Sequence, residues 1–185
     1  MIRQLSVLTL LAVLAAPAAA VEYRTVLPKQ SQVSFEFRQM GVPIKGGFKR
    51  FAVEMAFDPA KPEDARAKLE IDIASIDAGS PEADQESAGK LWFNRGAYPK
   101  AVFVSREVRQ LAQNRFELVG TLTLKGRSRE LRIPVAYVPG KDVSRFEGTF
   151  VLKRLDFGIG EGMWADLNTV ANEVRVNFRI AARGN

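Results

Sequence analysis

The sequence predicts an all-β protein, because hydrophobic and polar residues alternate with a period of two along most of residues 21–185. Proline and glycine residues separate the alternating segments, and a single segment has the pattern of a helix. Segments that alternate in this way form strands with one buried face. Several such strands in series favour an antiparallel barrel or a sandwich, and closure into a barrel removes exposed strand edges.

Residues 1–20 have the pattern of a secretory signal peptide. Arg3 supplies the positive charge, residues 5–16 form a short apolar run, and Ala18, Ala19 and Ala20 are small residues of the kind that signal peptidase recognises. Neither this run nor any later one reaches the roughly 20 apolar residues of a membrane-spanning helix. We therefore expect cleavage after Ala20, export of the protein, and a single mature domain over residues 21–185.

Eight segments have the alternation of half-buried strands. In the first of them, Val33, Phe35 and Phe37 alternate with Ser34 and Glu36. One segment, residues 101–108, is apolar on both faces for part of its length, so its inward face is ambiguous. The predicted strands span residues 33–37, 51–57, 69–73, 101–108, 118–124, 131–137, 146–152 and 174–180, with an additional short strand at residues 23–27.

The one predicted helix covers residues 80–92. Ser80 is a suitable N-cap, and Pro81 fits the first helical position. Acidic residues follow in the first turns, where they interact favourably with the helix dipole. Trp92 at the end of this segment and Trp164 beside the glycine-rich residues 158–162 lie outside the predicted strands. A lid over the mouth of a barrel would occupy that position, and packing of the helix onto the barrel is the other role open to these tryptophans.

The chain contains neither cysteine nor histidine, which excludes several classes of site. Disulfides, thiolate nucleophiles, Ser-His-Asp catalysis, structural zinc and histidine-ligated haem all need one of these residues. We therefore expect no cofactor and no metal site. Asp156 and Asp166 form a conceivable carboxylate pair for glycoside hydrolysis. Ion pairing at a strand end or capping of a turn is the simpler role for both.

The formal net charge is +6, but acidic and basic residues are separated along the chain. Residues 54–86 carry ten acidic and three basic residues, whereas residues 106–141 carry three acidic and eight basic ones. We expect the hairpin that carries Lys125, Arg127, Arg129 and Arg132 to be exposed to solvent. The sequence has no basic helix and no aromatic-basic RNA-binding motif, so we do not expect nucleic acid as a partner.

The predicted inward faces are rich in phenylalanine and include Gly120 and Gly148. A glycine on such a face leaves space for a ligand or marks a sharp bend in the strand. A small barrel is either filled by its own side chains or holds one small ligand. Alternation alone leaves both possibilities open.

Blocks of sequence spread over nearly all of residues 21–182 follow a known pattern in the same order. They are Ser31-Gln-Val-Ser-Phe35, Gly47-Phe48, Ile73-Ala-Ser-Ile-Asp-Ala-Gly79, Asp84, Tyr98-Pro-Lys-Ala-Val-Phe-Val-Ser105, Gly120-Thr-Leu-Thr-Leu-Lys-Gly126, Leu131-Arg-Ile-Pro-Val135, Lys153-Arg-Leu-Asp-Phe-Gly-Ile159 and Glu173-Val-Arg-Val176. These blocks resemble the YceI-like family of exported, lipocalin-like lipid-binding proteins. Many members have histidines around the first of these blocks, where this chain has Gln30 and Gln39, so no histidine-dependent role is implied.

The resemblance implies an extended, lipocalin-like antiparallel barrel of about eight strands, with one short helix and an apolar central cavity. It also implies a periplasmic, non-enzymatic protein that holds a polyisoprenoid, an isoprenoid quinone or a fatty-acyl lipid for transport, storage or sequestration. Two alternatives stay open: an accessory subunit that presents a quinone or lipid to a cytochrome b-type membrane protein, and a carboxylate-dependent hydrolase. The oligomeric state also stays open, with a dimer as one option.

Residues on the inward faces are the expected ligand contacts, and the two tryptophans are expected nearer the mouth. The expected cavity residues are Phe35, Phe37, Phe51, Val53, Met55, Ile71, Ile73, Phe103, Leu122 and Phe150, together with Trp92 and Trp164.

Overall fold

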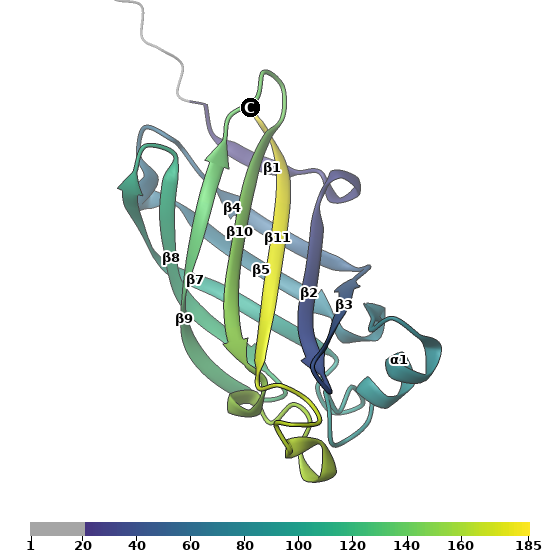
Figure 1. The fold of residues 1–185 in the computed structure, drawn as a ribbon. Helices are drawn as coiled ribbons and strands as arrows, with labels where there is room; N and C mark the ends of the chain where they lie inside the picture. The colour runs from purple at the N-terminus through teal and green to yellow at the C-terminus, as the bar shows by residue number, and fades with distance from the viewer. Residues whose placement is uncertain (1–20) are drawn as a thin grey trace, which may run out of the picture.

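The computed structural model describes residues 21–185, and the predicted signal peptide at residues 1–20 lies outside the described residues. The described chain forms one curled antiparallel sheet with a single short α-helix beside it (Figure 1). The strands are β1 (Tyr23–Val26), β2 (Gln32–Gln39), β3 (Val42–Phe48), β4 (Phe51–Ala56), β5 (Arg66–Asp72), β6 (Ile76–Asp77), β7 (Lys100–Ala112), β8 (Arg115–Leu124), β9 (Arg127–Val138), β10 (Ser144–Lys153) and β11 (Glu173–Gly184), and the helix is α1 (Pro81–Ser87).

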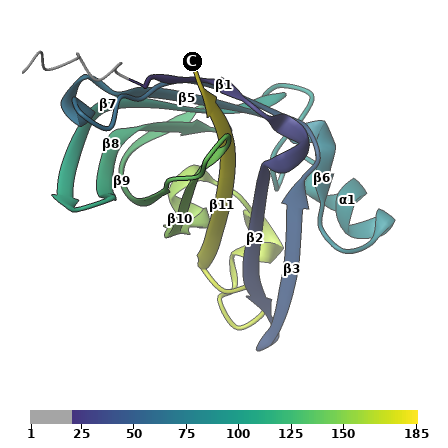
Figure 2. The same cartoon turned by 90° about the horizontal axis from the view of Figure 1, so that it is seen from above.

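The prediction of an all-β antiparallel fold with one short helix is confirmed, but the expected count of eight strands is wrong. Ten strands follow one hydrogen-bonded path, β4-β5-β7-β8-β9-β10-β11-β2-β3-β6, and β1 pairs with β11 outside that path. Seen from above, the sheet curls round on itself, so that one of its faces is concave (Figure 2). At one end β1 also reaches across to the end of β4. Tyr23 N–H donates to the Phe57 carbonyl at 2.8 Å, and Phe57 N–H donates to the Tyr23 carbonyl at 3.2 Å.

The sequence pattern missed two strands, β3 and β6. Pro43 lies within β3 and is tolerated because, over most of its length, β3 pairs with β2 alone. Gly46 pairs with Phe35, and the ring of Phe35 covers it so closely that a Cβ on Gly46 would overlap the ring. β3 therefore lacks the alternating side chains that identify a strand, and β6 is only two residues long.

Phenylalanine rings also fill the space beside the two inward glycines that the sequence analysis singled out. A Cβ on Gly120 would overlap the ring of Phe103 and the Val104 carbonyl, and a Cβ on Gly148 would overlap Phe178 and the Pro134 carbonyl. These glycines thus allow a neighbouring ring to approach the strand closely. They do not by themselves create empty space.

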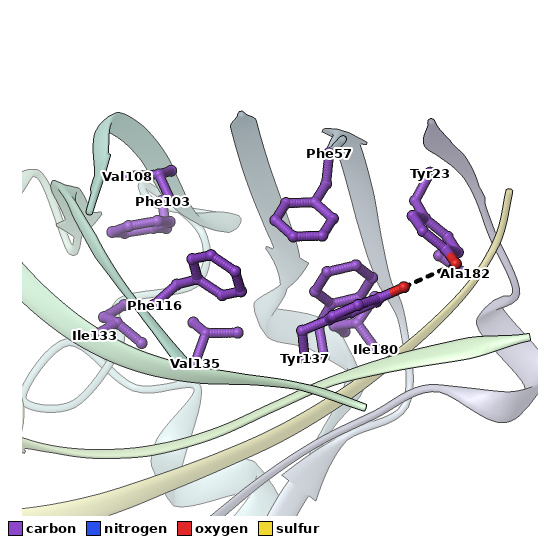
Figure 3. Close-up of a cluster of buried hydrophobic side chains, with 11 residues drawn as sticks. Tyr23, Phe57, Phe103, Val108, Phe116, Ile133, Val135, Tyr137, Ile180 and Ala182 are labelled. Atoms are coloured by element: carbon purple, nitrogen blue, oxygen red, sulfur yellow. Dashed lines mark hydrogen bonds between the residues drawn. The ribbon is translucent and has the colours of Figure 1, made fainter. Parts of the chain in front are cut away.

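One end of the curled sheet is closed by an aromatic core (Figure 3). Tyr23, Phe57, Tyr137 and Phe146 pack there with ring centroids 5.1–6.3 Å apart. The Tyr137 hydroxyl donates to the Tyr23 hydroxyl at 2.9 Å, and the Ser144 hydroxyl donates to the same oxygen at 3.0 Å. Desolvation is the main cause that raises the pKa of Tyr137 above its ordinary value. This end of the molecule is therefore densely packed, with its polar atoms paired.

The helix begins as predicted and ends earlier. Ser80 Oγ accepts a hydrogen bond from Ala83 N–H at 3.2 Å, and Pro81 is the first helical residue. α1 ends at Ser87, because residues 88–98 form a series of tight turns in which both Trp92 N–H and Asn94 N–H donate to the Gly89 carbonyl. No helix within the described residues is long and apolar enough to cross a membrane.

Candidate ligand-binding cavity

The concave face of the sheet encloses a cavity of about 790 Å³. Strands β2–β11 contribute its walls, and α1 with the turn after it covers one side. The lining is mostly aliphatic and aromatic, and cavities of this kind and size are typical of small-molecule sites. The aromatic core of Tyr23, Phe57, Tyr137 and Phe146 does not line it, so the cavity lies beyond that closed end.

The structure brings most of the predicted cavity residues to one surface. Nine of the twelve line the cavity: Phe35, Phe37, Val53, Ile71, Trp92, Phe103, Leu122, Phe150 and Trp164. Contact of these side chains with a ligand remains a prediction.

The other three predicted residues, Phe51, Met55 and Ile73, do not line the cavity. Phe51 and Met55 share a strand face with Val53, and all three pack against the buried hydrophobic cluster that includes the aromatic core. Ile73 lies in a 3₁₀ turn (Ile73–Ser75) instead of a strand, and only 1% of it is exposed. Alternation indicates which face a residue occupies, whereas local packing decides which residues of that face line the cavity.

Sequence reasoning also omitted residues that line the cavity. Val33 and Val176 lie on the same inward faces as predicted contacts, so the alternation already contained their signal. Ile44 of β3, and Ile159 and Val170 of the loop between β10 and β11, lie outside the predicted strands. No pattern in the sequence marks these three: Ile44 lies on a strand that the alternation missed, and packing of the loop places Ile159 and Val170 at the cavity.

Arg154 organises the loop between β10 and β11, at the polar part of the cavity wall. Arg154 and Asp156 both lie in a 3₁₀ turn (Arg154–Phe157), and Arg154 is 2% exposed. Its five N–H groups donate to backbone carbonyls of Ala171, Ile159, Gly160, Trp164 and Val170 at 2.7–3.0 Å. Burial lowers the pKa of Arg154, but an arginine stays charged at neutral pH.

The same loop requires glycine at position 160. Gly160 has a φ of 73°, and a Cβ there would overlap the Arg154 guanidinium. The backbone can therefore wrap around the buried charge only where no side chain intervenes. Ile159 and Gly160 of the glycine-rich segment thus form part of the shell of Arg154.

Trp92 and Trp164 pack against each other beside Arg154, with ring centroids 5.6 Å apart. Trp164 Nε1 donates to Glu86 Oε1 of α1 at 3.0 Å, which ties the loop to the helix. Trp92 Nε1 is buried and has no hydrogen-bond partner within residues 21–185. Both rings line the cavity, in the region where the sequence placed a lid.

The basic hairpin between β8 and β9 is less exposed than predicted at Lys125. This side chain is only 8% exposed, and its Nζ donates to the Gly158 carbonyl at 2.6 Å and to Glu161 Oε2 at 3.0 Å. Arg127 pairs with the other Glu161 oxygen at 2.8 Å. The hydrogen bond from Lys125 is the main reason why the pKa of Glu161 lies below its ordinary value. The hairpin therefore fastens the Arg154 loop to the sheet.

Asp166, one of the two carboxylates considered for glycoside hydrolysis, caps its own turn. Its Oδ1 accepts from Asn168 N–H at 3.1 Å, and its Oδ2 accepts from the Thr169 hydroxyl at 2.9 Å. These hydrogen bonds lower the pKa of Asp166, and the one from the Asn168 N–H has the largest effect. Within residues 21–185 no group of three or more acidic side chains is placed to hold a metal ion.

Comparisons with known proteins all point to one family. Residues 25–182 match the model of the YceI-like domain. A UPF0312 protein of Azotobacter vinelandii is 32% identical over 170 residues, which cover 86% of this chain and 85% of that protein. A UPF0312 protein of Pseudomonas fluorescens is 32% identical over 179 residues, which cover 88% of this chain and 87% of that protein.

Solved structures have the same fold. The crystal structure of Burkholderia cenocepacia BcnA matches with a TM-score of 0.83 and 37% identity, over 85% of this chain and 99% of that one. A polyisoprenoid binding domain from Saccharophagus degradans matches with a TM-score of 0.67 over 90% of this chain and 99% of that one, and at 14% identity this likeness shows the fold alone. The sequence blocks, the curled sheet and these matches agree, and the chain belongs to the YceI-like family.

Proposed function

We propose that this protein is a non-enzymatic binding protein that holds the hydrocarbon chain of a long amphiphile in its cavity. The observation that carries the proposal is the 790 Å³ cavity with a mostly apolar lining. Burial of a hydrocarbon chain stabilises a complex by roughly 0.8 kcal/mol per CH₂ group. A chain that lies along this wall gains affinity without any convergent set of polar groups.

The ligand class that we propose is a polyisoprenoid, an isoprenoid quinone or a fatty-acyl lipid. The solved relative from Saccharophagus degradans is described as a polyisoprenoid binding domain, which supports the same class for this chain. Aromatic side chains such as Phe35, Phe37 and Phe150 line the wall and suit a branched, unsaturated chain. Transport, storage or sequestration of that lipid is the proposed role.

We propose the periplasm as the site of action, on the basis of the signal-peptide pattern at residues 1–20. The protein is expected in the osmotic-shock fraction with Val21 as its first residue. N-terminal sequencing tests this directly. An exported fraction that retains Met1 contradicts the processing.

Native mass spectrometry of protein purified without added lipid tests the binding proposal. We expect an adduct of one lipid per chain, and organic extraction should release an isoprenoid or acyl lipid of the same mass. A chain that carries no lipid, and that also fails to take up long isoprenoids in solution, contradicts the proposal.

A further inference from the structure

Strands β9 and β10 are neighbours in the sheet but pair over only a small part of their length. Three residue pairs join them: Arg145 with Val138, Phe146 with Tyr137, and Glu147 with Ala136. By contrast, β9 pairs with β8 over ten residues, and β10 pairs with β11 over ten residues. The three pairs lie at the closed end, near the C-terminus (Figure 1). Beyond them the sheet has a seam, formed by residues 127–134 of β9 and 149–153 of β10.

The pairing ends just before it reaches Pro134, which has no N–H to donate. On the other strand, a Cβ on Gly148 would overlap the Pro134 carbonyl, so the two strands are still close at this point. Since β8 and β11 hold the two strands on their far sides, the seam leaves backbone groups unpaired between two well-paired strands. Such groups need water or a ligand as a partner.

A pocket of about 540 Å³ lies over the seam on the outer surface of the sheet. Arg132 and Thr149 line it from the outer face, because successive side chains of a strand point to opposite faces. Leu131 and Phe150 line both this pocket and the cavity. A lipid that passes from the cavity to the pocket beside these two residues has no strand pairing to break.

The basic side chains that line the cavity already have partners. Lys68 Nζ forms an ion pair with Glu70 at 2.8 Å, and the five N–H groups of Arg154 all donate to backbone carbonyls. An anionic head group inside the cavity would therefore lack a free charged donor, and burial of an unpaired charge is costly.

The pocket over the seam, by contrast, contains a free basic side chain. The Arg175 guanidinium has no hydrogen-bond or ion-pair partner within residues 21–185, although Glu36 lies opposite it across β11 and β2. Arg132 donates to Glu117 at 3.4 Å, and Glu130, the acidic residue of the pocket, is paired with an arginine of β7 at 3.0 Å. Guanidinium groups suit carboxylates and phosphates, which they bind with two parallel hydrogen bonds.

We propose that the pocket over the seam is a head-group site for anionic amphiphiles. The hydrocarbon chain lies in the cavity and leaves it beside Leu131 and Phe150, and the carboxylate or phosphate at its end binds Arg175 and Arg132 on the outer surface. The charged head thereby stays in contact with water while the chain is buried. This inference rests on the proposed function, since it assigns a class of head group to the same lipid.

Three probes that share one chain and differ at the head test the site: geranylgeraniol, geranylgeranoic acid and geranylgeranyl phosphate. Each is titrated into delipidated protein at about 0.1 M salt. We expect both anions to bind about three- to tenfold more tightly than the alcohol, as two exposed charge contacts allow. This preference should disappear at about 1 M salt, which screens exposed charges. A protein that binds neither anion more tightly than the alcohol at low salt overturns the inference.

Two variants on one face of β11 assign the preference to the pocket. Arg175→Gln removes the free guanidinium and should bring the ratio of anion affinity to alcohol affinity close to one. Arg179→Gln is the matched control, because Arg179 is already bonded to Glu147 at 3.1 Å and does not line the pocket. This variant should keep the wild-type ratio. An Arg175→Gln protein with the wild-type ratio contradicts the proposed site.

Protection of an introduced thiol locates the head group independently of affinity. The chain has no cysteine, so Val151→Cys places its only thiol in the pocket, and Val104→Cys places it on the outer face of β7. Both valines are 47% exposed. Geranylgeranyl phosphate should slow the reaction of Val151→Cys with a maleimide and leave that of Val104→Cys unchanged. Equal reaction rates of Val151→Cys with and without this lipid overturn the inference.

Inorganic phosphate distinguishes a lipid site from a site for free anions. At the same concentration as the lipid, it should protect neither thiol, because it has no chain to bury in the cavity. Protection of Val151→Cys by inorganic phosphate as strong as that by the lipid overturns the inference alone. Failure of all three geranylgeranyl probes to bind overturns the proposed function with it.

Discussion

The Arg154 guanidinium carbon lies 5.9 Å from the centroid of the Trp92 ring, so a buried cation and an aromatic wall of the cavity are in contact. Arg154 holds five carbonyls of the β10–β11 loop, and Trp92 belongs to the turn after α1. The two segments are also joined by hydrogen bonds from Gly160 N–H and Glu161 N–H to the Leu91 carbonyl, both at 2.8 Å. One side of the cavity therefore depends on this contact.

Replacement of Arg154 should destabilise the fold strongly. Arg154→Met leaves five loop carbonyls without a donor, and we expect a loss of about 2–4 kcal/mol in the free energy of unfolding. Arg154→Lys keeps the charge but offers only three donors, so its loss should be intermediate. Arg175→Lys on the exposed face of β11 is the control and should change stability by less than about 0.5 kcal/mol. Urea denaturation measures all three, and an Arg154→Lys variant as stable as wild type contradicts this role.

A larger side chain inside the cavity should shorten the bound lipid. Val176 lines the cavity and pairs with Phe35 and Phe150, whereas Val104 on the outer face of β7 is 47% exposed. Val176→Phe should retain less lipid, or lipid with a shorter chain, by mass spectrometry of the extracted ligand. Val104→Phe makes the same change on the outer surface and should retain wild-type lipid. Identical lipid in two folded variants would show that the chain does not pass Val176.

Acid should destabilise the protein in part through Glu70 of β5. Hydrogen bonds from Lys100, at 2.6 Å, and Lys68, at 2.8 Å, are the main causes that lower its pKa from 4.5 to about 2. Because the pKa is lower in the folded state, this contribution is present above pH 4.5 and is lost as the pH falls toward 2. The melting temperature of Glu70→Gln should therefore fall less over that range than that of wild type. The difference should shrink at about 1 M salt, which screens exposed pairs; equal acid sensitivity at low salt contradicts the assignment.

The close approach of Phe178 to Gly148 should make that glycine intolerant of a side chain. Gly148→Ala places a Cβ against both the Phe178 ring and the Pro134 carbonyl, so we expect a loss of about 1–3 kcal/mol. Gly96→Ala is the matched control, because no atom lies within 4 Å of the Cβ that it adds. Thermal and urea denaturation compare the two. A Gly148→Ala variant as stable as Gly96→Ala means that the ring and the strand are farther apart than the structure shows.

The strands that could be predicted from the sequence are those whose one buried face imposes alternation. In β11 the residues Val174, Val176, Phe178 and Ile180 all line the cavity, as their period of two requires. β3 was not predicted because Pro43 and Gly46 interrupt the alternation, and its pairing with β2 decides its conformation instead. The helix start was predictable from Ser80 and Pro81, since capping chemistry is local.

The cavity itself was only partly predictable. Phe51, Val53 and Met55 have the same parity on β4 and pack against the same buried hydrophobic cluster, yet only Val53 lines the cavity. Alternation reports the face of the sheet but not the local packing that decides which side chain of that face reaches the cavity. The role of Arg154 was also hidden, because its partners are backbone carbonyls of a loop whose path the sequence pattern does not define.

The most direct test of the central claim is the affinity of delipidated protein for isoprenoid alcohols of increasing length, measured at about 0.1 M and about 1 M salt. If apolar burial in the cavity supplies the affinity, the dissociation constant should fall with each added isoprene unit until the cavity is full. It should also change little with salt, because screening weakens exposed charge contacts and not apolar burial. Short phosphorylated analogues that bind as tightly as long alcohols, with affinity that collapses at high salt, would contradict the account.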